Sequence, residues 1–184
     1  MKISKKVLSV GLVLAVLIFS TALIKMVSAQ SDEPTNAQIQ LVRANCLTLK
    51  STLNQLHASD ALLRVNMGQS YESLSIKLMS GFNDRIANNN LNNDTLASTT
   101  NSYNSALNDF RTDYQTYEEQ MSSALNIDCT NQPSSFYDAV SLARTYRDRV
   151  HVDIVNLNQF ITQYQSAIDQ FENDYLLSLD GTTR

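Results

Sequence analysis

Apolar positions recur at alternating intervals of three and four residues along three long stretches of the chain. In the last stretch the row consists of Phe136, Val140, Ala143, Arg147, Val150, Ile154, Leu157, Ile161, Tyr164, Ile168, Phe171 and Tyr175. This spacing is typical of helices with coiled-coil-like packing, whereas the two-residue alternation of strands never lasts more than a few residues here. The predicted fold class is therefore all-α.

Two further rows precede this one. The first begins near residue 36, after Pro34-Thr35, and comprises Ile39, Val42, Cys46, Leu49, Leu53, Leu56, Asp60, Leu63 and Met67, with a drift toward Tyr71, Leu74, Leu78 and Phe82. The second comprises Leu96, Thr100, Tyr103, Leu107, Phe110, Tyr114, Tyr117, Met121 and Ala124. Between these rows the asparagine-rich residues 88–94 favour a loop, because their side chains bond to nearby backbone groups. Pro133, which precedes the last row, can open a helix but cannot continue one.

These signals predict helices over about residues 36–87, 94–127 and 134–178. Short joins require chain neighbours to run antiparallel, so we expect an elongated up-down-up three-helix bundle over residues 36–178. At 1.5 Å per residue, the last helix would be roughly 65 Å long. Residues 179–184 are expected to form a disordered tail, because Gly181 follows the last turn.

The first thirty residues follow a different pattern. Three lysines precede an apolar run over residues 7–24, and small residues follow it up to Ala29. This order is typical of a secretory signal peptide, with cleavage after Ala29. A run of about eighteen apolar residues is also long enough to cross a bilayer, so an uncleaved membrane anchor is the alternative. Both interpretations place the domain outside the cytoplasm, either secreted or anchored to the outer face of the cytoplasmic membrane, with residues 30–35 as a linker.

The charge of the exported part limits its partners. Loss of residues 1–29 removes four lysines and no acid, which leaves 10 basic against 18 acidic side chains and a net charge of −8. Nucleic acids and anionic membrane surfaces both require clustered Lys and Arg. We therefore exclude nucleic acid as a partner, and we expect membrane contact only through the N-terminal segment if it is retained.

Cys46 and Cys129 are the only cysteines of the chain. An even count in an exported chain favours a disulfide, and a hairpin of the first two helices would bring these positions to one level near its open end. The bond would close a loop of about 80 residues and stabilise the fold by roughly 4 to 5 kcal/mol. Two buried free thiols, or a bond between two chains, are the alternatives.

The same register explains the arginine in the last apolar row. Arg147 would lie level with Asp60, and the facing position on the second helix would carry the Tyr114 hydroxyl, with Arg64 one turn above. A lone buried charge is strongly unfavourable, whereas a paired and hydrogen-bonded charge can be tolerated. We interpret this buried polar layer as a device that fixes helix register. A ligand or proton site is the alternative.

Groups that carry chemistry are sparse. His57 and His151 are the only histidines, and both lie beside the apolar rows, roughly 10 Å apart along the bundle at 1.5 Å of rise per residue. No zinc motif accompanies them, so we predict no metal or other cofactor. Glu118-Glu119 is expected on a solvated face, where neither carboxyl can serve as a general acid or base. We predict that the protein is not an enzyme.

Several short segments carry a resemblance to known proteins. They are "NC" at residues 45–46, "SDALLRVNMGQSYESLSIKLM" at 59–79, "IDC" ending at Cys129 and "FYDAV" after Pro133. Together they resemble uncharacterised exported helical-bundle proteins of very small episymbiotic bacteria, over nearly the whole chain after residue 29. That group has no assigned activity to carry over. The resemblance implies an envelope location and a role at contacts with another cell.

Two functions fit these predictions. The first is a non-enzymatic envelope protein, in which a rigid, disulfide-bonded helical rod binds a protein partner or another copy of itself through a helical face. The second is an extracytoplasmic ligand-binding or sensor-like module that uses the layer of Asp60, Arg64, Tyr114 and Arg147. A solvent-open layer against a pocket would favour the second function, and a filled layer with an apolar stripe elsewhere would favour the first.

Overall fold

A computed structural model describes residues 33–182 of the chain. The chain divides into two units, Met1–Glu33 and Pro34–Arg184, and every described helix lies in the second. The predicted signal or anchor segment, residues 1–29, lies outside the described residues. None of the helices between residues 33 and 182 combines the length and the hydropathy that a membrane span requires.

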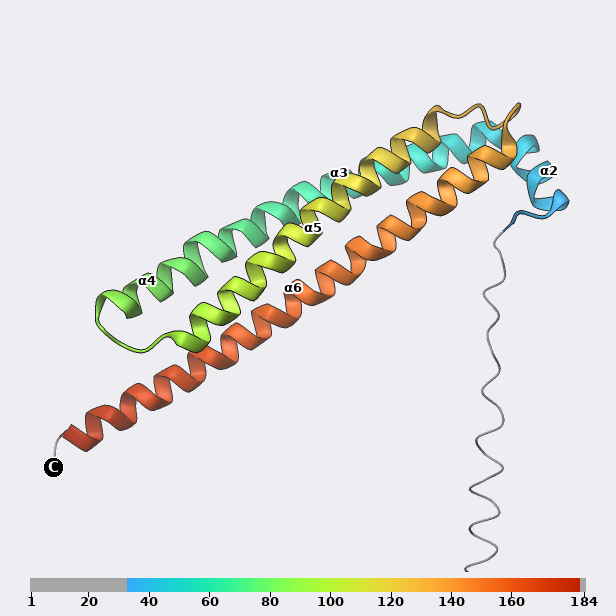
Figure 1. Cartoon of the computed structure of the whole chain (residues 1–184). Helices are drawn as coiled ribbons and strands as arrows, with labels where there is room; N and C mark the ends of the chain where they lie inside the picture. Colours follow the sequence, from blue (N-terminus) through green and yellow to red (C-terminus); the bar gives the residue numbers. More distant parts are fainter. Residues whose placement is uncertain (1–32, 183–184) are drawn as a thin grey trace, which may run out of the picture. The chain divides into compact units, whose positions relative to one another are not determined.

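The described residues contain helices and no strands, which confirms the all-α class (Figure 1). In chain order the elements are α2 (Asn36–Ala44), α3 (Cys46–Ser73), the π-helix η1 (Leu74–Ser80), α4 (Gly81–Asn88), α5 (Asp94–Asn126) and α6 (Pro133–Thr182). Figure 1 shows that α3, η1 and α4 follow one another along a single course, and that the chain then turns back into α5.

The predicted helix over residues 36–87 is wrong in one respect, because the chain breaks at Asn45. Thr35 caps α2 as a capping box, in which its hydroxyl accepts from the Gln38 amide and the Gln38 side chain accepts from the Thr35 amide. At the other end, the backbone amide and the side-chain amide of Asn45 both donate to the Leu41 carbonyl, at 3.0 and 2.9 Å. Asparagine competes with the helix in this way, so α2 ends at Ala44, and Asn45 separates it from α3.

The π-helix η1 changes which side chains face the core. Ser75 and Met79 are buried, whereas Leu78, which the predicted row places inside, is 51% exposed. A π-helix holds more residues per turn than an α-helix, so the side chains within it rotate out of the preceding row. The Tyr164 hydroxyl, which comes from α6, donates to the Met79 carbonyl at 3.1 Å.

Both predicted joins are loops, and their side chains explain why. Asn90 has a φ of 57°, a left-handed conformation that asparagine tolerates better than most residues. In the second join, Asp128 accepts from the backbone amides of Thr130 and Asn131. Pro133 is then the first residue of α6, as expected for a proline that opens a helix.

The predicted tail from residue 179 is helical as far as Thr182. Figure 1 shows that α6 continues past the loop between α4 and α5. The segment over residues 171–178 contains acidic, aromatic and leucine side chains, which are compatible with a helix, and Gly181 alone does not end it.

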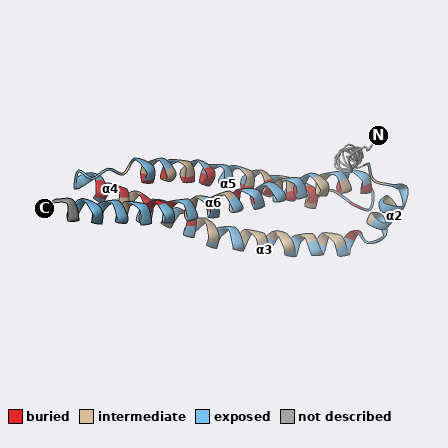
Figure 2. Ribbon diagram, turned by 90° about the horizontal axis from the view of Figure 1, so that it is seen from below, coloured by how far each residue is buried: buried red, intermediate tan, exposed pale blue. Residues whose placement is uncertain are grey.

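The core lies mainly between α5 and α6 (Figure 2). α5 buries ten side chains: Leu96, Thr100, Tyr103, Ala106, Leu107, Phe110, Tyr114, Tyr117, Met121 and Ala124. On α6 buried residues repeat every seven positions, as Phe136, Ala143, Val150, Leu157 and Tyr164, and all of these but Phe136 belong to the main core with α5. α3 differs, because its only buried residues are Cys46 and Tyr71, near its two ends.

Cys46 and Cys129 form a disulfide, as predicted, with their Cα atoms 5.4 Å apart. They are packed with Phe136 in a small apolar cluster at the start of α3 and α6. At the far end of α3, the Tyr103 hydroxyl donates to the Tyr71 carbonyl at 3.0 Å. α3 is therefore fastened to the other helices at both ends, while its middle is only half-buried.

Candidate functional site

The predicted pair of charges meets near the middle of α3. Arg147 of α6 donates to Asp60 of α3 through Nε at 2.7 Å and through Nη2 at 3.0 Å, which makes a bidentate bridge. The Tyr117 hydroxyl of α5 donates to the same carboxylate at 2.7 Å. One carboxylate thus connects three helices, and the predicted pairing of Asp60 with Arg147 is confirmed.

The protonation states follow from these contacts. Burial raises the pKa of Asp60, but the hydrogen bonds from Arg147 and Tyr117 and the nearby positive charges outweigh it and hold the pKa below its usual range. The bond to Asp60 raises the pKa of Arg147. Burial, and then the bond to Asp60, raise the pKa of Tyr117. At neutral pH the group is therefore a carboxylate, a guanidinium and a neutral phenol.

The bridge is less buried than the sequence predicted. The Asp60 side chain is 13% exposed, but the Arg147 side chain is 47% exposed. Arg147 occupies the side of α6 that faces α3, and α3 does not close over it. The charge of Arg147 in the apolar row is tolerated because its guanidinium contacts both water and the Asp60 carboxylate.

The prediction that the Tyr114 hydroxyl joins Asp60 is wrong. Tyr114 donates instead to Glu118, one turn further along α5, and Glu118 also contacts His57 Nε2 of α3 at 2.8 Å. Tyr114 and Tyr117 lie three residues apart on one helical face, so the hairpin register alone could not distinguish them. Glu118, expected on a solvated face, is a half-buried bridge between α3 and α5.

Arg64 lies beside this group, as predicted, but binds differently from Arg147. Its guanidinium carbon is 4.8 Å from the centre of the Tyr114 ring, which is a cation–π contact. Over residues 33–182, Arg64 has no carboxylate partner within salt-bridge distance. Burial, and then the bond to Glu118, raise the pKa of the Tyr114 hydroxyl, so this phenol stays neutral.

A cavity of about 210 Å³ lies against this layer, and we call it the central cavity. Its apolar wall consists of Leu63, Met67, Phe110, Val150 and Ile154. Its polar wall includes Asp60, Arg64, Tyr114, Tyr117, Arg147 and His151. Because α3, α5 and α6 all contribute, the cavity occupies the place where the middle of α3 stands away from the packed pair of helices.

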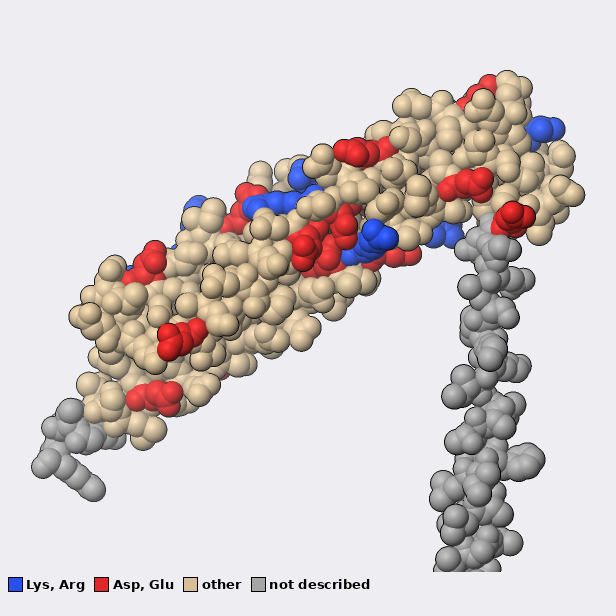
Figure 3. Space-filling view, viewed as in Figure 1, with Lys and Arg blue, Asp and Glu red and all other residues tan. Residues whose placement is uncertain are grey.

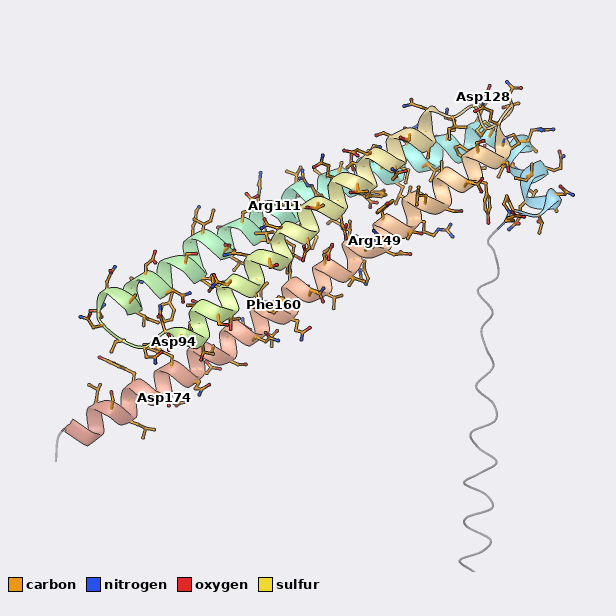
Figure 4. All side chains as sticks on the ribbon, in the orientation of Figure 1. Asp94, Arg111, Asp128, Arg149, Phe160 and Asp174 are labelled. Carbon is orange, nitrogen blue, oxygen red and sulfur yellow. A yellow bond between two sulfur atoms is a disulfide. The ribbon has the colours of Figure 1, made fainter. Side chains whose placement is uncertain are left out.

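A second group of charges, outside the central cavity, lies between α5 and α6. Asp153 is only 8% exposed, and its Oδ2 atom has no hydrogen-bond partner. Burial raises the pKa of Asp153 to about 6, and the negative charges of Asp113 and Asp109 on α5 contribute to this rise. Figure 3 shows acidic atoms gathered near the middle of the face that it presents. Asp153 itself lies on α6 between Arg149 and Phe160, both of which are labelled in Figure 4.

The burial of Asp153 could have been predicted from a second spacing on α6, which differs from the apolar row of the last helix. Tyr146, Phe160 and Ala167 are spaced from Asp153 by sevens, so all four share one side of α6. An aspartate in a column of aromatic and small residues indicates a buried carboxyl.

Within the part of the chain that the structure describes, no three His, Cys, Asp or Glu side chains are arranged to hold a metal ion.

Comparison with known proteins adds no name to this site. No family model, no curated protein and no solved structure matches the chain.

The Asp60–Arg147 bridge predicts an energetic coupling that can be measured. In a double-mutant cycle with Asp60→Ala and Arg147→Ala, we expect a coupling of roughly 1 to 2 kcal/mol, less than for a fully buried pair because Arg147 is half-exposed. Because the pKa of Asp60 is lowered in the folded state, this coupling should be complete at pH 7 and lost as the pH falls below about 4.

Urea unfolding followed by circular dichroism provides the free energies for this cycle. Arg149→Ala is the matched control, since Arg149 lies on the same helix, stacks on Tyr146 and is not paired with Asp60. The control cycle combines Asp60→Ala with Arg149→Ala and should show no coupling. If the losses of unfolding free energy for Asp60→Ala and Arg147→Ala are additive as well, the bridge is contradicted.

The buried Asp153 predicts the opposite dependence on pH. Since its folded-state pKa of about 6 is above the ordinary value, ionisation opposes folding, and stability should fall as the pH rises from about 4 through 6. Asp153→Asn should remove this decline and stabilise the protein at pH 7.5 by roughly 1 to 2 kcal/mol. The exposed Asp148→Asn should change neither property, and the same pH profile for Asp153→Asn and wild type would refute the assignment.

Proposed function

We propose that the protein is a non-enzymatic, extracytoplasmic ligand-binding module, built as an elongated three-helix bundle that takes a small amphipathic molecule into the central cavity. The observation that carries this proposal is the half-open polar layer, in which a water-accessible Arg147 and an unpaired Arg64 stand against an apolar cavity wall. An open layer against a pocket is the arrangement that favours ligand binding over a purely structural layer.

The size and lining of the central cavity restrict the ligand. Ligand pockets commonly measure about 300 to 1,000 Å³, so a cavity of about 210 Å³ suits a small molecule that is partly exposed. Part of the lining offers aliphatic and aromatic contacts, and the rest offers guanidinium, phenol and carboxylate groups. A molecule with one apolar end and one polar end would satisfy both walls.

The neighbouring polar groups support binding and not catalysis. The carboxylate of Asp60 already accepts from Arg147 and Tyr117, and the low pKa makes it a poor proton donor or acceptor near neutral pH. The phenols of Tyr114 and Tyr117 have raised pKa values and remain protonated. These groups can orient a ligand without reacting with it.

Association through a helical face is the second candidate function. Large apolar side chains are exposed on the outer part of α3 and η1, among them Leu62, Val65 and Ile76. Such side chains favour contact with a protein partner or with another copy of the chain when they form one patch. The ligand function ranks first because the cavity unites apolar and charged groups from three helices at one place.

Binding of octan-1-ol tests the proposed function, because this probe is amphipathic but uncharged. We expect millimolar affinity by calorimetry, with amide shifts in a two-dimensional nitrogen–proton spectrum confined to residues that line the central cavity. Ile154→Phe fills part of the cavity and should weaken binding about tenfold, since a phenyl ring occupies the space of several methylene groups.

Val155→Phe is the matched control for this experiment. Val155 is the next residue on α6 and is exposed, so its replacement leaves the cavity unchanged and should leave the affinity unchanged. No binding to the wild-type protein, or the same loss in both variants, would reject the cavity as a binding site and leave association as the remaining candidate.

A further inference from the structure

The charged side chains around the central cavity differ in how many of their hydrogen-bonding atoms already have a partner. Both oxygens of Asp60 accept hydrogen bonds, from Arg147 and from Tyr117. Arg147 uses Nε and Nη2 in this bridge, which leaves Nη1 without a bond to Asp60. The carboxylate is therefore engaged, while the guanidinium that neutralises it keeps donors to spare.

Arg64 supplies the second cation and has no ion-pair partner over residues 33–182. The Tyr114 ring holds its guanidinium through a cation–π contact at 4.8 Å. This contact fixes the position of the planar group but uses none of its five donors. A guanidinium held by a ring face, with its edge unoccupied, is suited to bidentate binding of a carboxylate.

The remaining titratable groups of the lining do not reverse this balance. His151 is exposed and has no carboxylate partner among residues 33–182, and Asp148 is an exposed carboxylate whose charge water screens. The chain after residue 29 carries 18 acidic against 10 basic side chains, whereas the lining of the central cavity carries two arginines and two aspartates, of which Asp60 is already paired with Arg147. An anion would find here the cationic donors that most of the surface lacks.

The apolar lining of the central cavity determines the size of the apolar part of the ligand. At about 30 Å³ for each water molecule, the central cavity holds the volume of roughly seven waters, which is similar to that of a short alkyl chain. Met67, Phe110 and Ile154 would contact such a chain. Met67 and Ile154 are half-buried, so a bound chain would cover apolar surface that water now reaches.

We infer that the central cavity binds a medium-chain monocarboxylate, with the alkyl chain against Phe110 and Ile154 and the carboxylate on the free edge of Arg64. This inference rests on the proposed function of the cavity and adds the chemical class of its ligand. Binding replaces the water on Arg64 with a charge-assisted hydrogen-bonded pair and leaves the bridge between Asp60 and Arg147 intact.

Three probes of equal chain length test the inference: octanoate, octan-1-ol and octylammonium. Calorimetry at pH 7.5 and low salt should show that octanoate binds about tenfold more tightly than octan-1-ol, because hydrogen bonds to charged groups contribute more than neutral ones. Octylammonium should bind more weakly than the alcohol. The advantage of octanoate should shrink in high salt, since the site is partly exposed.

Arg64→Gln should abolish the advantage of octanoate and leave the affinity for octan-1-ol unchanged. Arg64 is exposed on α3, so this variant should fold, which its circular dichroism spectrum checks. The control is Arg43→Gln, which removes an exposed arginine from α2 and should retain the full preference for octanoate.

The outcomes separate the two claims. If octan-1-ol binds and octanoate binds no better, the cavity is an apolar site and the inference about Arg64 is wrong while the proposed function stands. A preference for octylammonium, or an octanoate preference that survives in Arg64→Gln, would also overturn the inference. If none of the three probes binds, the proposed function itself fails.

Discussion

The way in which α3 is held determines the rest of the structure. At one end the disulfide between Cys46 and Cys129 ties it covalently to the chain that enters α6. At the other end Tyr71 is buried, and its carbonyl accepts from the Tyr103 hydroxyl of α5. Between these two attachments α3 buries no side chain, whereas α5 has buried side chains at intervals from Leu96 to Ala124. The middle of α3 therefore lies beside α5 and α6 without close packing, and its two ends are fixed.

This constraint explains why a charged bridge and a cavity occur together. If α3 packed tightly against α5 and α6 here, Arg147 would lose its water, and the desolvation of a buried ion pair can cost more free energy than the pairing returns. Because the middle of α3 is only half-buried, the Arg147 guanidinium stays hydrated. The bridge to Asp60 then holds α3 where apolar side chains do not fill the space between it and the other two helices. The central cavity is the space that remains, and it places the unpaired Arg64 beside an apolar wall.

Sequence patterns predicted the features that depend on periodicity and register. The three-four spacing indicated the helices, and the hairpin register paired Cys46 with Cys129 and placed Asp60 beside Arg147. The pattern could not show the break at Asn45 or the π-helix η1, because both depend on local backbone hydrogen bonds. It also chose Tyr114 over Tyr117, since a register is defined only to within one turn. The cavity was not predictable, because the row of Leu53, Leu63 and Met67 does not reveal how closely a neighbour approaches.

Amide hydrogen exchange of the wild-type protein tests the central claim most directly, because it measures how firmly each helix is held. Residues 53–67 of α3 and residues 103–117 of α5 are segments of equal length in long helices. If the middle of α3 is held by little more than the Asp60–Arg147 bridge and the His57–Glu118 contact, its amides should exchange about a hundredfold faster than those of α5 under native conditions. Equal protection of the two segments would show that the middle of α3 is packed as tightly as α5, which would contradict the loose packing of α3 and the cavity that depends on it.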